Sequence, residues 1–434
     1  MNDTICAIAT PMGTGGIGIV RVSGPETKQI AHRLLGRHPE SRIAEYGSFR
    51  DEKNEPIDSG IALFFEGPNS YTGEDVLELH GHGGVVVQQL VCKRVLVLGA
   101  RMAEPGEFTQ RAYLNNRIDL AQAEAVADLI NASSAEAVRA SSRSLSGLFS
   151  REVHALDENI LKVRTYVEAA IDFADEDIDF LSDETLQKQV EATRTHLNSL
   201  LTRTREGAVL HQGLTVVIAG APNVGKSSLL NALLNEDRAI VTEVAGTTRD
   251  TLSEKIHIHG MPVRLIDTAG LHESEDRIEE EGIARARSAI QQADLILWVT
   301  EDHDVKHPRE SPTTHLMVLN KCDLTSNKPG LVRDNTVRIS ALQKTGLKEL
   351  RELVAQFAGH RVSDDAFAGR PRHISALEAV GQHLQKVEEF LANSMSELVA
   401  EELRQAHQQL GKIVGETSTE DLLGEIFSNF CIGK

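Results

Sequence analysis

The chain has 434 residues, of which 64 are acidic and 45 are basic, giving a formal net charge of −19. Because a nucleic acid is held mainly through lysine and arginine, this acidity argues against a surface that binds a polyanion along the whole chain, and an aromatic content of 4% argues against a base-stacking platform. The four cysteines lie far apart without disulfide or zinc spacing, and neither a run of ~18 apolar residues nor a basic leader is present, so we expect a cytoplasmic protein without a membrane span.

At roughly 150 residues per domain, this length predicts two to four domains. Changes in sequence pattern divide the chain into four segments, residues 1–117, 118–212, 213–360 and 361–434. The first has short alternating strands with glycine-rich breaks, and the second and fourth have apolar residues at helical spacing. The third alternates apolar strands with amphipathic helices, which is typical of a parallel α/β sheet. The sequence therefore predicts a multidomain α+β and α/β protein in which an α/β domain is inserted between helices that pack together.

Within the third segment, residues 220–227 (GAPNVGKS) match the phosphate-loop pattern G-x-x-x-x-G-K-[ST]. A strand is predicted before the loop, at residues 215–219, and a helix after it, from near Ser228. Glycines allow backbone N–H groups to surround phosphates, and the helix N-terminus adds positive potential. Lys226 would reach the β- and γ-phosphates, and the Ser227 hydroxyl could bind Mg²⁺. The pattern predicts a nucleoside triphosphate site.

A polar, turn-rich segment follows at residues 242–250 (TEVAGTTRD), where a threonine could complete the Mg²⁺ shell when GTP is bound. The next predicted strand, residues 263–266, runs into residues 267–270 (DTAG). Asp267 would hold the Mg²⁺ shell, and the Gly270 amide could contact the γ-phosphate. Both segments are typical of the switch regions of a GTPase.

The residue after this segment is Leu271, where Ras-like enzymes place a glutamine that orients the attacking water. A leucine side chain cannot do this, so another group must position the water. The next dozen residues contain several acidic candidates: Glu273, Glu275, Asp276, Glu279, Glu280 and Glu281. Spacing alone does not choose among them.

The base-recognition elements come last in the third segment. A predicted strand, residues 316–319, ends in residues 320–323 (NKCD), and residues 340–341 (SA) follow a further strand. The Asp323 carboxylate can accept hydrogen bonds from guanine N1–H and from the exocyclic amine, neither of which adenine offers. The wrong base would leave a buried acceptor unpaired, so this arrangement selects GTP over ATP. Four elements in this order predict a GTP-binding domain rather than a coincidental α/β domain.

In the last segment, apolar residues recur every three or four positions. They are Leu377, Val380, Leu384, Val387, Leu391, Met395 and Leu398. This periodicity predicts one long buried seam of a helix packed in a bundle.

The phosphate loop, followed by residues 245–250 (AGTTRD), resembles the MnmE family of tRNA-modification GTPases, also called TrmE. The similarity extends along the whole chain and includes residues 10–18 (TPMGTGGIG), 71–75 (YTGED), 114–116 (LNN), 119–124 (DLAQAE) and 431–434 (CIGK). The last motif is the most family-specific, since other GTPases of this superfamily lack it. The resemblance implies a folate-binding-like α/β domain over residues 1–117, a two-part helical domain, and an inserted Ras-like P-loop GTPase domain over residues 213–360.

The resemblance also implies potassium-dependent GTP hydrolysis, with K⁺ at the place where Ras-like enzymes receive an arginine finger. The matching K⁺ positions are Asn223, Thr242, Val244 and Thr247, Mg²⁺ would be held by Ser227 and Thr248, and the family's water-orienting glutamate aligns with Glu279. The positions expected to contact the nucleotide are Asn223, Val224, Gly225, Lys226, Ser227, Ser228, Thr242, Glu243, Val244, Ala245, Gly246, Thr247, Thr248, Asp267, Thr268, Ala269, Gly270, Asn320, Lys321, Asp323, Ser340 and Ala341.

The N-terminal domain of relatives takes a 5-formyl- or 5,10-methylene-tetrahydrofolate. The positions matching its contacts are Arg21, Glu78, Arg117 and Lys434. Relatives often carry lysine at the position of Arg117, so the charge is kept while the hydrogen-bonding geometry differs. Cys431 would lie beside the folate, where the family depends on it for tRNA modification but not for GTP hydrolysis.

The partners implied by the resemblance are a second copy of the chain, bound through the N-terminal domain, and the FAD-containing protein MnmG (GidA) in a heterotetramer or larger complex. Together they would add an aminomethyl or carboxymethylaminomethyl group to C5 of the wobble uridine of certain tRNAs, and the partner could supply a basic surface. Two alternatives stay open. One is a GTPase switch in RNA or ribosome assembly without folate chemistry, and the other is an N-terminal domain that dimerises without binding folate.

Overall fold

The computed structural model describes residues 3–11, 13–132, 134–172, 184–237, 253–258, 261–267, 293–303, 315–325, 327–357, 365–393, 395–415, 420–428, 430, 431 and 433. Contacts divide the chain into two compact units. The first comprises Met1–Ala127, Leu145–Leu181 and Glu389–Lys434, and the second comprises Asp128–Ser144 and Ser182–Glu388. Each unit is therefore assembled from segments that are not contiguous in the sequence. Among the described helices, none has both the length and the apolar character required to cross a membrane.

The first unit contains a six-stranded sheet with the strand order β3-β4-β5-β2-β1-β6. Its strands are β1 (Ile5–Ile8), β2 (Ile17–Ser23), β3 (Glu45–Arg50), β4 (Pro56–Phe65), β5 (Val76–His82) and β6 (Arg101–Met102). All neighbouring pairs are antiparallel except β1 and β6, which are parallel. The alternation of apolar and polar residues that predicted strands in this segment therefore occurs in β2 and β5, which pair with each other.

Successive residues of a strand point to opposite faces, and both faces of β1 are covered. Cys6 lies in the core formed with the helices α1 (Thr27–Leu35) and α2 (Val85–Val97). Ile5 and Ala7 point the other way and pack with Phe108 of α3 (Glu107–Leu114). This second face is the one to which Arg21 of β2 also belongs, because Ala7 is the register partner of Arg21.

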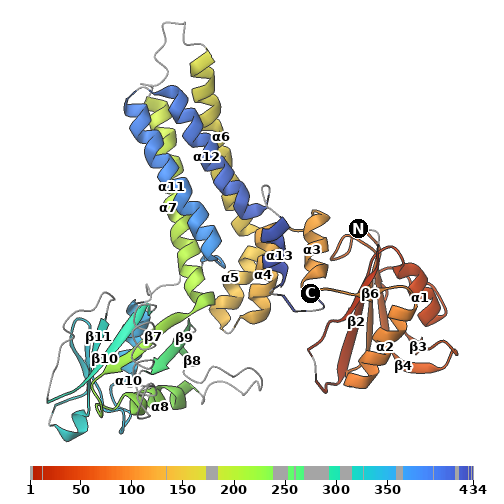
Figure 1. Cartoon of the computed structure of the whole chain (residues 1–434), viewed down its shortest axis with the longest axis horizontal. Coiled ribbons are helices and arrows are strands. Elements are labelled where there is room, and N and C mark those ends of the chain that lie inside the picture. Colours follow the sequence, from red (N-terminus) through yellow and green to blue (C-terminus); the bar gives the residue numbers. More distant parts are fainter. Residues whose placement is uncertain are drawn as a thin grey trace, which may run out of the picture. The chain divides into compact units, whose positions relative to one another are not determined.

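After α3, the described helices of the first unit are α4 (Leu120–Asn131), α6 (Leu148–Asp172), α12 (Ser396–Val414) and α13 (Glu420–Ser428). Of these, α6 and α12 bury apolar residues at heptad-like spacing. The buried residues of α6 are Val153, Leu156, Ile160, Val163 and Val167, and those of α12 include Val399, Leu403, Ala406 and Leu410. These two helices run side by side (Figure 1), and His407 of α12 bonds Asp157 of α6 through Nδ1 and Oδ1 at 2.6 Å.

The second unit contains a seven-stranded sheet with the order β12-β13-β11-β10-β7-β9-β8. Its strands are β7 (Leu214–Gly220), β8 (Ser253–Ile258), β9 (Met261–Asp267), β10 (Leu295–Glu301), β11 (His315–Asn320), β12 (Gly330–Arg333) and β13 (Thr336–Arg338). The five central strands are parallel, and β8 and β12 are antiparallel edges. Carboxyl ends of parallel strands meet at one edge of a sheet, which is where ligands bind in open α/β folds.

Helices of the second unit are α5 (Ala135–Leu145), α7 (Glu184–Gln212), α8 (Lys226–Asp237), the 3₁₀ turn η3 (Cys322–Leu324), α10 (Leu347–Phe357) and α11 (Pro371–Ala392). Arg194 of α7 pairs with Glu388 of α11 at 2.9 Å, so these helices lie side by side, as Figure 1 shows. The fold class predicted from the sequence, α+β and α/β parts joined by helices, is confirmed.

One predicted feature of the helices is wrong. The seam expected to continue from Leu377 to Leu398 is buried only as far as Leu391, whereas Met395 and Leu398 are 45% and 46% exposed. Helix α11 ends at Ala392 and α12 begins at Ser396, so the chain turns between them. Met395 and Leu398 keep the apolar spacing in the sequence although their side chains are exposed. The next buried apolar residue is Val399, which belongs to the separate spacing of α12.

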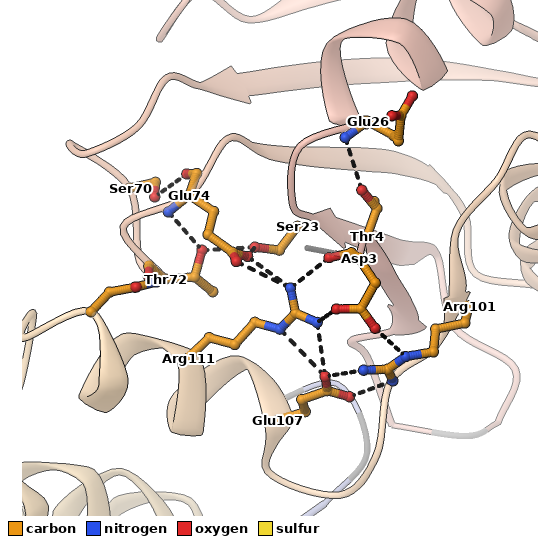
Figure 2. A network of polar contacts seen from close by, with 11 residues as sticks. Asp3, Thr4, Ser23, Glu26, Ser70, Thr72, Glu74, Arg101, Glu107 and Arg111 are labelled. Carbon is orange, nitrogen blue, oxygen red and sulfur yellow. Dashed lines mark hydrogen bonds and ion pairs between the residues drawn. The ribbon is translucent and has the colours of Figure 1, made fainter. Parts of the chain in front are cut away.

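A buried ion network fixes the start of the chain in the first unit (Figure 2). The guanidinium of Arg111, 1% exposed, pairs with Asp3 at 2.9 Å, Glu107 at 2.9 Å and Glu74 at 3.1 Å. Burial alone would raise the pKa of Glu107, but hydrogen bonds led by that from Arg101 hold this pKa below its ordinary value. A buried charge left without its partner costs about 3–5 kcal/mol. Pairing with the Arg111 guanidinium therefore offsets the free-energy cost of bringing these carboxylates together.

The same network positions the loop of residues 70–75. Glu74 also accepts a hydrogen bond from Ser23 Oγ of β2 at 2.7 Å, and Ser23 Oγ lies 2.7 Å from Thr72 Oγ1. The loop of residues 70–75 is therefore tied both to β2 and, through Arg111, to α3. Figure 2 shows these side chains converging from three separate segments of the chain.

Candidate functional site

The phosphate loop connects β7 to α8, as predicted, although the helix begins at Lys226 rather than near Ser228. Asn223 and Gly225 adopt the left-handed backbone conformation, with φ of 65° and 95°. Lys226 is 6% exposed, and its Nζ donates hydrogen bonds to the carbonyls of Gly220 at 3.1 Å and Ala221 at 2.9 Å. The ammonium group is thus held inside the concave side of the loop, at the carboxyl end of a central strand.

Asn320, at the end of β11, joins this loop to the segment after β13. Its Nδ2 donates to the Val224 carbonyl at 2.9 Å, and its Oδ1 accepts from the Ala341 amide at 3.0 Å. A Cβ at Gly225 would collide with the Asn320 amide group, so only glycine permits this approach. Three segments that are far apart in the sequence are therefore locked together by a single buried side chain.

The predicted base-reading residues also lie together. Asp323 is in η3, directly after β11, and its Oδ1 accepts a hydrogen bond from Ser340 Oγ at 2.5 Å. Lys321 has a left-handed φ of 64° and pairs with Glu301 at the end of β10. Asp323 is only partly buried, which leaves a carboxylate at the surface of this edge of the sheet, fixed in direction by a serine.

Asp267 ends β9, whose register pairs it with Ile218 of β7, so its backbone lies beside the phosphate loop strand. The other predicted contacts fall outside the described residues. These are Thr242, Glu243, Val244, Ala245, Gly246, Thr247, Thr248, Thr268, Ala269, Gly270, Glu279 and Lys434. The described part of the chain brings the remaining nucleotide positions to one edge of the sheet, and their roles stay predictions.

A second candidate site lies on the N-terminal sheet. Arg21 of β2 and Glu78 of β5 are register partners and form an ion pair with Nη2 and Oε1 at 2.8 Å. Their side chains are 17% and 16% exposed, so a ligand can still reach them. The Arg21 guanidinium lies over the rings of Tyr71 and Phe108, 5.6 and 5.7 Å from the centroids. Such cation–π contacts fix the plane of the guanidinium.

Sequence reasoning gave no site role to Phe108 or His80 and included Tyr71 only in the motif of residues 71–75. His80 Nε2 lies 3.1 Å from Glu78 Oε2, so Glu78 is held between an arginine and a histidine. Burial raises the pKa of Tyr71, although a hydrogen bond with Thr109 works against the increase. The alternation of β5 placed Glu78 and His80 on one face, which was the signal available in the sequence.

The C-terminal residues lie against this second site. Arg21 Nη1 donates to the Gly433 carbonyl at 3.5 Å, and the Gly106 amide donates to the Cys431 carbonyl at 3.4 Å. Gly433 is buried with φ of 98°, and a Cβ there would stand 2.7 Å from the Ile8 carbonyl oxygen. Cys431 is exposed, whereas Cys6, Cys92 and Cys322 are buried. The one accessible thiol of the chain therefore lies on a segment that contacts Arg21.

Arg117, the third predicted folate position, follows α3 and is exposed. Its Cγ and Cδ are each 3.3 Å from the place a Cβ would occupy on Gly73, so its stem packs on the loop of residues 70–75. That loop also carries Tyr71. The structure thus connects Arg117 to the surroundings of Arg21 through this loop, and its contact with a folate stays a prediction.

Comparison with known proteins adds an independent finding. Residues 4–117 match the family model described as the GTP-binding protein TrmE N-terminus, and residues 120–431 match the MnmE helical domain. The tRNA modification GTPase MnmE of Methylococcus capsulatus is 50% identical over 446 residues, covering 100% of this chain and 99% of the relative. The proteins of the same description from Stutzerimonas stutzeri and Pseudomonas aeruginosa are 50% and 49% identical, with the same coverage.

Proposed function

Because this chain belongs to the MnmE family of tRNA modification GTPases, we propose that it is a potassium-dependent GTPase that modifies the wobble uridine of certain tRNAs with an FAD-containing partner. The chain is a GTP hydrolase acting in tRNA modification. The finer proposal is that a tetrahydrofolate supplies one carbon, and that an aminomethyl or carboxymethylaminomethyl group is added at C5. The proposed assembly contains two copies of the chain and the partner MnmG (GidA).

For GTP hydrolysis, we assign the triphosphate to the loop of residues 220–227. Lys226 would exchange its bonds to the Gly220 and Ala221 carbonyls for the β- and γ-phosphates, which are stronger acceptors. Ser227 and Thr248 would hold Mg²⁺, and Asn223 with Thr242, Val244 and Thr247 would hold K⁺. When bound, the two cations neutralise charge that develops on the phosphate oxygens.

Water must be oriented for attack on the γ-phosphate, and the Leu271 side chain has no polar atom to do so. We assign this role to Glu279, whose carboxylate can accept a hydrogen bond from the water. A carboxylate with this role affects the rate of GTP hydrolysis and not the affinity for GTP.

For the one-carbon step, Glu78 can accept hydrogen bonds from the amino and ring N–H groups of the folate's pterin, and Arg21, which lies beside Glu78, can donate to an oxygen at the same end. Arg117 and Lys434 can pair with the carboxylates of the folate's glutamate tail. The observation that carries this proposal is that the segment with the exposed Cys431 contacts Arg21, the partner of Glu78. Neither the nucleotide domain nor a simple RNA switch requires such a contact.

Nucleoside analysis of cells that lack this protein tests the proposal. Digested tRNA from these cells should lose the C5-substituted wobble uridine, and expression of the chain from a plasmid should restore it. An unmodified nucleoside profile would contradict the proposal, and together with intact GTP turnover it would favour the switch in RNA or ribosome assembly.

Exchange of K⁺ for Na⁺ should slow GTP hydrolysis by about tenfold or more, because a fixed charge near the bond being broken is worth at least that much. The measurement is the steady-state rate at equal ionic strength, with saturating Mg²⁺ and GTP in both salts. The variant Asn223→Ala is the matched control, since it should show the low rate in either salt. Equal wild-type rates in K⁺ and Na⁺ would refute the cation assignment.

A further inference from the structure

A buried carboxylate, that of Asp302, directly follows β10 and contacts the segments that carry the base-reading residues. The Asp302 side chain is 0% exposed. It accepts hydrogen bonds from Arg338 Nε at 2.6 Å, Thr325 Oγ1 at 2.6 Å and Asn327 Nδ2 at 2.8 Å. Burial alone would raise the pKa of Asp302, but these hydrogen bonds, led by that of Thr325, hold it below its ordinary value. The group is therefore an ionised carboxylate at neutral pH, surrounded by donors.

Two of these donors, Thr325 and Asn327, come from the segment that follows the turn carrying Asp323. Thr325 directly follows η3, and its amide donates to the Cys322 carbonyl at 3.1 Å, which closes the turn around Asp323. The Asp302 amide itself donates to the Asn320 carbonyl at 2.9 Å, at the point where the same turn begins. Asp302 thus fixes both the beginning and the end of the base-reading turn.

The third donor comes from β13, which is separated from β10 by β11. Arg338 ends β13, two residues before Ser340. Ser340 is fully buried, and its hydroxyl donates to Asp323 Oδ1. One buried carboxylate therefore connects the strand that supplies Ser340 with the turn that supplies Asp323, without itself lying at the surface.

We propose that Asp302 is a positioning residue for guanine recognition, which sets the direction of the Asp323 carboxylate relative to Ser340. This inference rests on the proposed base-reading role of Asp323. Hydrogen-bond strength falls steeply with angle and distance, so a small displacement of Asp323 weakens both of its bonds to guanine. The side-chain hydrogen bonds of Asp302 go to Thr325, Asn327 and Arg338 and not to the phosphate loop, so contacts with the phosphates are expected to persist.

The variant Asp302→Asn tests this, because its amide keeps the side-chain shape but places an NH2 donor at one of the two oxygen positions, where it faces either Arg338 or the pair Thr325 and Asn327, which are themselves donors. The nucleotides to compare are GTP and inosine triphosphate, which lacks the exocyclic amine and so makes only one of the two bonds to Asp323. Wild type should prefer GTP by about tenfold, the value of one charge-assisted hydrogen bond. In Asp302→Asn this ratio should fall to about twofold, with KM for GTP rising by more than kcat falls.

The matched control is Asp294→Asn, at the opposite end of β10. Asp294 Oδ2 accepts from the Thr215 amide at 2.8 Å and has no contact with η3, so the preference for GTP should stay at the wild-type value. If Asp302→Asn does not fold, as judged by circular dichroism, Asn327→Ala removes the side-chain hydrogen bond from Asn327 Nδ2 to Asp302 and should lower the ratio in the same direction.

Each outcome is decisive. A weaker affinity for both nucleotides with an unchanged ratio would overturn the inference, because general destabilisation of the domain acts on both alike. A wild-type chain that binds GTP without distinguishing it from inosine triphosphate would instead remove the base-reading role of Asp323, and this inference with it.

Discussion

Replacement of Asp323 by asparagine is expected to lower the affinity for GTP by about a hundredfold, or about 2.7 kcal/mol. An asparagine amide would present a donor to guanine N1–H and to its exocyclic amine, which are themselves donors. Xanthine carries a carbonyl in place of that amine, so the same variant should bind xanthosine triphosphate more tightly than wild type does. The Ser340 hydroxyl can still donate to the side-chain oxygen that it contacts at 2.5 Å in the wild type, which keeps the amide oriented.

The measurement is equilibrium binding of GTP, xanthosine triphosphate and ATP to both forms, followed by hydrolysis of the preferred nucleotide. Because Lys226 and the phosphate loop are unchanged, Asp323→Asn should hydrolyse saturating xanthosine triphosphate at about the wild-type GTP rate. An unaltered GTP affinity would show that another group recognises the base.

Replacement of Cys431 by serine should reduce tRNA modification by about a hundredfold while GTP hydrolysis stays at the wild-type rate. A serine hydroxyl is a much weaker nucleophile than a cysteine sulfur unless an adjacent base activates it. The change is nearly isosteric and lies at an exposed position, so folding should be preserved. The assay is modification of tRNA transcripts in the reconstituted system, with GTP turnover measured in the same mixture.

Chemical labelling provides an independent version of this experiment. Of the four cysteines, Cys6, Cys92 and Cys322 are at most 5% exposed, so iodoacetamide should modify the native chain at Cys431 first. Wild type labelled at one thiol should behave as Cys431→Ser does, and the variant should be unaffected by the reagent. Loss of GTP turnover in Cys431→Ser would indicate a structural role for the thiol.

Features encoded within a few consecutive residues could be predicted from the sequence. The strand and helix around residues 220–227 occur where the glycine and lysine pattern placed them, because a phosphate loop is local. The buried positions of α11 followed from helical spacing as far as Leu391. The turn before Ser396 was missed because Met395 and Leu398 continue the apolar pattern although they lie outside the packed seam.

Features that depend on strand register and on distant partners could not be predicted. Arg111 bonds groups 37 and 108 positions away, and no periodicity relates them. Likewise, the two ends of the base-reading turn and the strand of Arg338 meet at Asp302 only because β10, β11 and β13 are neighbours. Sequence alone gave the resemblance of Arg21 and Glu78 to folate contacts, whereas their pairing required the alignment of β2 with β5.

The hydrogen bond from Arg21 to Gly433 joins residues 412 positions apart, which has a consequence for the order of folding. Closing so long a loop is entropically unfavourable, and contacts of this kind form late. The strands and helix around the phosphate loop need only short connections and can assemble much earlier. We therefore expect newly made chains to acquire nucleotide binding first, and to seat their last residues beside Arg21 only when the rest of the molecule has already taken shape.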